Sequence, residues 1–107
     1  MERFDETLYV TEMYRDGYFP KFLVDKVKSA LEDVVQYLES GERNTDKVQA
    51  RLDKAMDAIN DLQDEFDEND SEIETVARES IGRTVEDILR HYQINIDCET
   101  AISNRDW

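Results

Sequence analysis

The chain has 107 residues and a formal net charge of −14, from 13 basic and 27 acidic side chains. Binding to DNA or RNA phosphates needs clustered positive charge, so this charge excludes a nucleic-acid surface and disfavours anionic membranes. No apolar run approaches the roughly 20 residues of a membrane-spanning helix, and the first residues lack the pattern of a signal peptide. A single cysteine excludes an internal disulfide. We therefore expect a cytoplasmic protein with one domain over residues 1–107, stabilised by packing.

The first 19 residues are expected to form a short helix, because their apolar side chains have helical spacing: Phe4, Leu8, Met13 and Tyr14. The trio Tyr9–Val10–Thr11 would also suit an extended segment. A first long helix is predicted over residues 20–39. Pro20 suits its first turn, and Gly41 suits the left-handed position that ends a helix.

A second long helix is predicted over residues 45–68, after an N-cap at Asn44 or Thr45. Its apolar residues from Val48 to Phe66 are separated by alternating steps of four and three, which form an a/d seam.

A third long helix is predicted over residues 72–92, because Ser71 and Glu74 have the spacing of a capping box. Gly82 inside it predicts close approach of a neighbouring backbone or a slight bend. The tail over residues 93–107 is expected to pack along the bundle. The predicted fold is all-α: an antiparallel bundle of three long helices with a short N-terminal helix and a packed C-terminal tail. The predicted core is Leu23, Val27, Leu31, Val34, Leu38, Val48, Leu52, Ile59, Leu62, Phe66, Ile73, Ala77, Ile81, Val85 and Ile88.

An acidic stretch runs from Asp57 to Glu74, with nine acidic residues and no basic one. It can be a solvated surface, or a docking face for a basic partner such as the groove of a nuclease. Calcium binding by an EF-hand is disfavoured: a loop starting at Asp67 would place Glu72 where glycine is required and Arg78 where the bidentate glutamate belongs.

Aromatic residues concentrate at the N-terminus, with six of the ten in the first 22 positions: Phe4, Tyr9, Tyr14, Tyr18, Phe19 and Phe22. Such side chains serve as interface anchors, but docking of an N-terminal segment on a helical core needs the same residues and is the favoured interpretation. Phe19 would then be a hydrophobic staple for the helix that starts at Pro20.

The sequence contains few of the histidine and cysteine residues that act as nucleophiles or metal ligands. His91 is the single histidine, Cys98 is the single thiol, and no hydrolase, zinc or phosphate-loop motif is present. A Cys/His nucleophile pair or a metal cluster of these residues with Asp97 and Glu99 lacks the spacing that would fix its geometry. A ferritin-like metal site needs E-x-x-H pairs, which the sequence lacks. We expect no enzyme, no metal and no cofactor.

The stretch from Met13 to Lys26, MYRDGYFPKFLVDK, with the helical remainder to Trp107, resembles an uncharacterised family of small bacterial helical proteins known only as a domain of unknown function. The resemblance implies a bacterial, cytoplasmic protein with the turn from Gly17 to Pro20 as a signature, and it implies no activity, cofactor or catalytic residue. By type alone, small acidic helical proteins include the bacterial immunity proteins that cap basic toxin nucleases.

The leading hypothesis is a non-enzymatic protein–protein interaction module with a basic partner, and neutralisation of a toxin is its most concrete version. The residues expected to steer association are Asp61, Asp64, Glu65, Asp67 and Glu68, with Tyr14 and Tyr18 as anchors. The alternatives are a metal-dependent or acid–base enzyme that uses carboxylates with His91, and a structural homodimer.

Overall fold

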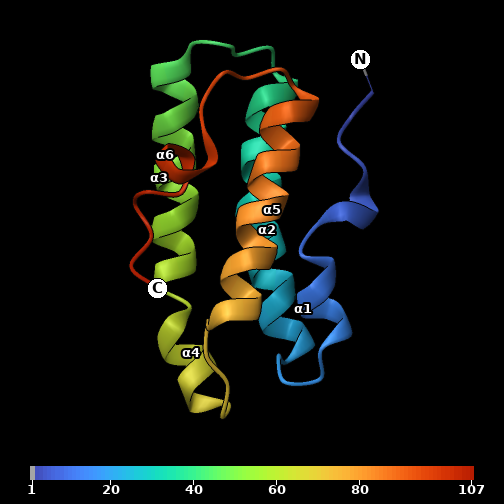
Figure 1. Ribbon diagram of the computed structural model, residues 1–107, viewed down its shortest axis with the longest axis vertical. Coiled ribbons are helices and arrows are strands. Elements are labelled where there is room, and N and C mark those ends of the chain that lie inside the picture. Colours follow the sequence, from blue (N-terminus) through green and yellow to red (C-terminus); the bar gives the residue numbers. More distant parts are fainter. Residues whose placement is uncertain (1) are drawn as a thin grey trace.

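The computed structural model describes residues 2–107, which contain helices and no strand. The all-α prediction is therefore confirmed. Three long helices lie side by side, and consecutive ones run in opposite directions (Figure 1). The helical elements are the 3-10 helix η1 (Glu6–Leu8), α1 (Thr11–Arg15), α2 (Lys21–Glu39), α3 (Thr45–Asn60), α4 (Gln63–Glu68), α5 (Thr75–His91) and α6 (Cys98–Ala101). None of the helices in residues 2–107 combines the length and the apolar character needed to cross a bilayer.

The core joins all three long helices, and every residue of the predicted core is buried. The N-terminal segment packs on α2 and α5, whereas the C-terminal tail packs on α3 and α5, so the two chain ends cover different sides of the long helices (Figure 1). Apolar spacing was sufficient to identify this core, because each long helix buries one continuous stripe of side chains.

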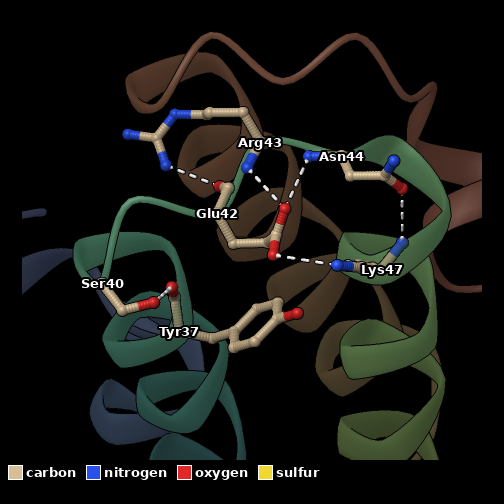
Figure 2. A network of polar contacts seen from close by, with 6 residues as sticks. All are labelled: Tyr37, Ser40, Glu42, Arg43, Asn44 and Lys47. Atoms are coloured by element: carbon tan, nitrogen blue, oxygen red, sulfur yellow. Dashed lines mark hydrogen bonds and ion pairs between the residues drawn. The ribbon is translucent and has the colours of Figure 1, made fainter.

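The turn between α2 and α3 follows the predicted chemistry. Gly41 has a φ of 103°, a conformation that glycine adopts without strain, and the Asn44 side chain accepts the backbone N–H of Lys47 at 3.1 Å as the N-cap of α3. The carboxylate of Glu42 accepts the backbone N–H groups of Arg43 and Asn44 at 3.2 and 3.0 Å and faces Lys47 (Figure 2). These bonds lower the pKa of Glu42 and fix the direction in which α3 leaves the turn.

The single helix predicted over residues 45–68 is wrong at one point: it is broken into α3 and α4 at Asp61 and Leu62. The break falls where Asp57, Asp61 and Glu65 would place like charges four residues apart on one helix face, which opposes helix formation. At the break the Leu62 N–H bonds the carbonyl of Ile59, three residues back. The buried seam nevertheless continues across it, and this is why periodicity alone predicts one helix.

The predicted start of the third helix is also wrong, because α5 begins at Thr75 and its N-cap residue, Glu74, makes no side-chain cap bond. Ser71 instead ends α4: its N–H bonds the carbonyl of Phe66 at 2.9 Å, and Asp70 before it has a φ of 56°. This is the Schellman arrangement that closes a helix C-terminus, and it buries Ser71. The residues that resemble a capping box for one helix are therefore used to end the previous one.

The N-terminal helix is interrupted. Tyr9 and Val10 separate η1 from α1, and both are buried, whereas Leu8 is 44% exposed. Val10 has a φ of 39°, which is strained for a β-branched residue. Its N–H donates to the Thr84 hydroxyl at 2.9 Å, and that hydroxyl donates to the Ser80 carbonyl, so α5 holds the strained residue in place.

The C-terminal tail packs as predicted, with Ala101 and Ile102 buried and Trp107 partly buried against the core. The Asn104 amide donates to the Asp57 carboxylate of α3 at 2.6 Å. Of the two alternatives for Gly82, close approach of a neighbouring backbone is wrong: an added Cβ would have the Ile102 side chain at 3.7 Å, and no backbone of another segment within residues 2–107 is as near.

Candidate functional site

Figure 1 shows α4 at one end of the molecule, drawn at the bottom together with the turn between α1 and α2, and α4 and the residues beside it in the sequence contain most of the acidic stretch. Asp61, Asp64, Asp67 and Glu68 are exposed, and within residues 2–107 none of them has an ion-pair partner. Glu65 differs, because Lys26 of α2 bonds its carboxylate at 2.8 Å. Four of the five predicted steering residues therefore lie exposed, without an ion-pair partner among residues 2–107.

Phe66 explains how a helix as acidic as α4 is held on the bundle. Its side chain is fully buried, and its ring lies edge-on to Phe19 with the centroids 6.4 Å apart. Phe19 in turn packs edge-on against Tyr18 at 5.2 Å. The predicted burial of Phe19 is confirmed, and this row of three rings joins the aromatic N-terminal segment to the acidic stretch.

Tyr18 lies beside the acidic stretch, with 44% of its surface exposed. Partial burial of its ring, and then the carboxylates of Glu72 and Glu74, raise the pKa of Tyr18. The phenol therefore stays protonated and can donate a hydrogen bond to a partner. One predicted anchor is thus placed next to the acidic residues that follow α4.

Phe22 belongs to the aromatic group of the first 22 residues, but it is not among the predicted anchors, which are Tyr14 and Tyr18. It is 50% exposed, the largest exposed fraction among the big apolar side chains of residues 2–107. The Lys26 ammonium lies 5.8 Å from the centre of its ring and also bonds Glu65, which places Phe22 near α4. The sequence did contain a signal that Phe22 is exposed, because the buried stripe of α2 starts at Leu23 and position 22 falls outside it.

Tyr14, the other predicted anchor, is placed elsewhere. Its hydroxyl donates to the Asp25 carboxylate of α2 at 2.6 Å, and its ring is half-buried against the core. Burial, and then this bond, raise its pKa, and its further charged neighbours are Glu32 and Glu6. None of these carboxylates belongs to the acidic stretch. We call residues 61–74, together with Tyr18 and Phe22, the acidic end; Tyr14 is not part of it.

His91 and Cys98 each have a partner of their own. The His91 Nε2 lies 2.5 Å from the carbonyl oxygen of Glu2, and the ring packs edge-on against Phe4 and Tyr92, so it holds the N-terminal segment. The Cys98 thiol donates to the Gly82 carbonyl at 3.3 Å. Burial, and then nearby Glu86 and Glu99, raise its pKa, which disfavours the nucleophilic thiolate. In the part of the chain described, no three His, Cys, Asp or Glu residues are grouped to hold a metal.

A pair of carboxyl groups that the sequence did not reveal lies between η1 and α2. A hydrogen bond and charge from Lys28 lower the pKa of Glu6, whereas burial, and then Glu6 itself, raise the pKa of Glu32. Two adjacent carboxyls with separated pKa values are the arrangement that acid–base enzymes use to exchange a proton with a ligand. Lys28 bonds Glu6 at 3.2 Å, so an intramolecular cation already occupies one member of the pair.

A model of a family described as a family of unknown function (DUF5713) matches residues 3–107. No curated protein matches the chain. No solved structure matches it.

Proposed function

The chain belongs to the family of unknown function DUF5713, and we propose that it is a non-enzymatic module that binds a basic protein through the acidic end. The observation that carries this proposal is the position of two exposed rings, Tyr18 and Phe22, beside carboxylates that lack an ion-pair partner within residues 2–107. Aromatic side chains supply most of the binding energy in many interfaces, and surrounding charges set the association rate and the choice of partner.

Each component has a separate physical role. The exposed carboxylates would attract a basic surface over a distance limited by salt screening, about 10 Å at 0.1 M ionic strength. Tyr18 and Phe22 would then lose exposed apolar surface on contact, and the Tyr18 hydroxyl would donate a hydrogen bond. Neutralisation of a basic toxin is the most concrete form of this function, because such a partner must be sequestered quickly and tightly.

The test uses a photo-reactive phenylalanine analogue in place of Phe22, expressed in cells of the native organism. We expect irradiation to cross-link a protein with a basic surface, which mass spectrometry identifies. The cross-link should weaken when Asp64→Lys is added, because this reversal removes attraction for the partner. Asp46→Lys is the matched control, because it makes the same charge change in the first turn of α3. The last turn of α3 is the end that leads to α4 and Asp64.

The purified partner then allows a kinetic measurement. Asp64→Lys should slow association and flatten its dependence on salt, with a smaller change in dissociation, whereas Tyr18→Ala and Phe22→Ala should mainly accelerate dissociation. If Asp64→Lys and Asp46→Lys had equal effects, the acidic end would have no special role. An acidic or neutral partner would also contradict the proposal.

A further inference from the structure

A second surface lies on the outer face of α5. A groove of about 510 Å³ runs between this face and α6, and Gly82 and Ile102 lie in its lining. The lining also contains four arginines and four carboxylates, so its formal charge is zero. In a chain with a net charge of −14, this is a face that a second copy could approach without the repulsion that the acidic end would cause.

The charges on this face form a regular pattern. Glu79, Arg83, Glu86 and Arg90 are all exposed, and their spacing of four, three and four residues places them in one row along α5. The row reads acid, base, acid, base. Read in the opposite direction it becomes base, acid, base, acid, so an antiparallel copy of the row presents an opposite charge at every position.

We propose that this face of α5 binds the same face of a second copy, with the two helices antiparallel about a two-fold axis that crosses the exposed row midway between Arg83 and Glu86. Glu79 then faces the partner's Arg90, and Arg83 faces the partner's Glu86. Because each contact occurs twice, the interface contains four ion pairs. The contact extends at most along α5, about 25 Å for its 17 residues, so the dimer is small, weak and sensitive to salt.

The same row has a simpler explanation that the test must separate. Glu79 with Arg83, and Glu86 with Arg90, are spaced for ion pairs within one helix. The second pair is formed at 2.9 Å, and within residues 2–107 no ion pair joins the first. Exchanging the charges at positions 83 and 86 separates the two explanations. Arg83→Glu combined with Glu86→Arg makes both pairs within the helix like-charged, yet keeps every contact between the copies opposite in charge.

The experiment is sedimentation velocity of the purified chain from about 10 µM to about 1 mM, a range that covers weak association. It is run in about 10 mM and about 1 M salt, between which the screening length falls from about 30 Å to about 3 Å. We expect the natural sequence to dimerise at low salt and to dissociate at high salt. Arg83→Glu and Glu86→Arg should each be monomeric, because each creates two like-charged contacts, and the double variant should dimerise again.

Lys54→Glu is the matched control, since it changes the charge as Arg83→Glu does at an exposed site on α3, and it should still dimerise. Circular dichroism establishes that each variant is folded; if Arg83→Glu does not fold, Glu86→Arg makes the same comparison. Three results would overturn the proposal: a monomer at low salt and about 1 mM, a folded double variant that remains monomeric, or equal loss of dimer in Lys54→Glu and Arg83→Glu.

Discussion

Two glycines are predicted to respond in opposite directions to the same substitution. Gly82 lies in the middle of α5, and a Cβ there would meet Ile102 at 3.7 Å, an ordinary van der Waals distance. Alanine restricts the unfolded chain more than glycine does, and this difference is worth about 1 kcal/mol in a helix interior. We therefore expect Gly82→Ala to raise the free energy of unfolding by about 1 kcal/mol.

Gly41 is the control because a Cβ there has open space, so its φ of 103° alone sets the outcome. An L-residue in a left-handed conformation costs about 1–2 kcal/mol, so Gly41→Ala should destabilise the protein by about that amount. Urea unfolding measures both changes. If the free energy of unfolding falls by about 2 kcal/mol per molar urea, the midpoint should rise by about 0.5 M for Gly82→Ala and fall by about 0.5–1 M for Gly41→Ala. A downward shift for Gly82→Ala would refute the contact geometry assigned to α5 and Ile102.

Three further substitutions test other parts of the structure. Phe66→Ala should cost about 3–5 kcal/mol in urea unfolding, because the ring is fully buried, and a loss below about 1 kcal/mol would show that α4 does not depend on it. Thr84→Val should cost about 1–3 kcal/mol by leaving the Val10 N–H without its partner, and an unchanged stability would contradict that bond. Glu32→Gln should stabilise the protein at neutral pH and lose this advantage below about pH 4, which unfolding measured against pH will check. Because the pKa of Glu32 is raised above its ordinary value of 4.5, the natural protein loses stability as the pH rises above 4.5. If the stability gained by Glu32→Gln grew as the pH fell, the pKa of Glu32 would be shifted in the opposite direction.

The fold could be predicted from apolar spacing because burial of a stripe is a local property of each helix. The helix boundaries could not, since they depend on bonds between segments. Ser71 is suited by type to cap α5, but its N–H ends α4. Val10 would be poor in a left-handed conformation on its own, and it adopts one because Thr84, 74 positions away, accepts its N–H.

Some features of the acidic end could likewise be predicted from the sequence, and others could not. Exposure of Asp64 and Asp67 followed from charge, because unpaired carboxylates are rarely buried. The roles of the aromatic residues did not follow from their type: Tyr14 is turned onto Asp25, and Phe22 is left at the surface by the rotation of α2 about its axis. Only the three-dimensional structure distinguishes Tyr14 from Phe22 in this way, although the position of Phe22 outside the buried stripe of α2 was a usable signal.

The two proposed surfaces are compatible, and their charges explain why. A dimer of this chain has a formal charge of −28, twice the −14 of each copy, so the copies repel one another, and this repulsion is smallest when they meet through a face of balanced charge. The outer face of α5 has that balance, whereas the acidic end does not. A two-fold axis at α5 leaves α4 and its loop outside the contact, so a dimer would present two acidic ends to basic partners. Salt would weaken both contacts, but Arg83→Glu should affect the dimer alone and Asp64→Lys the partner alone, which makes the two interactions separable by mutation.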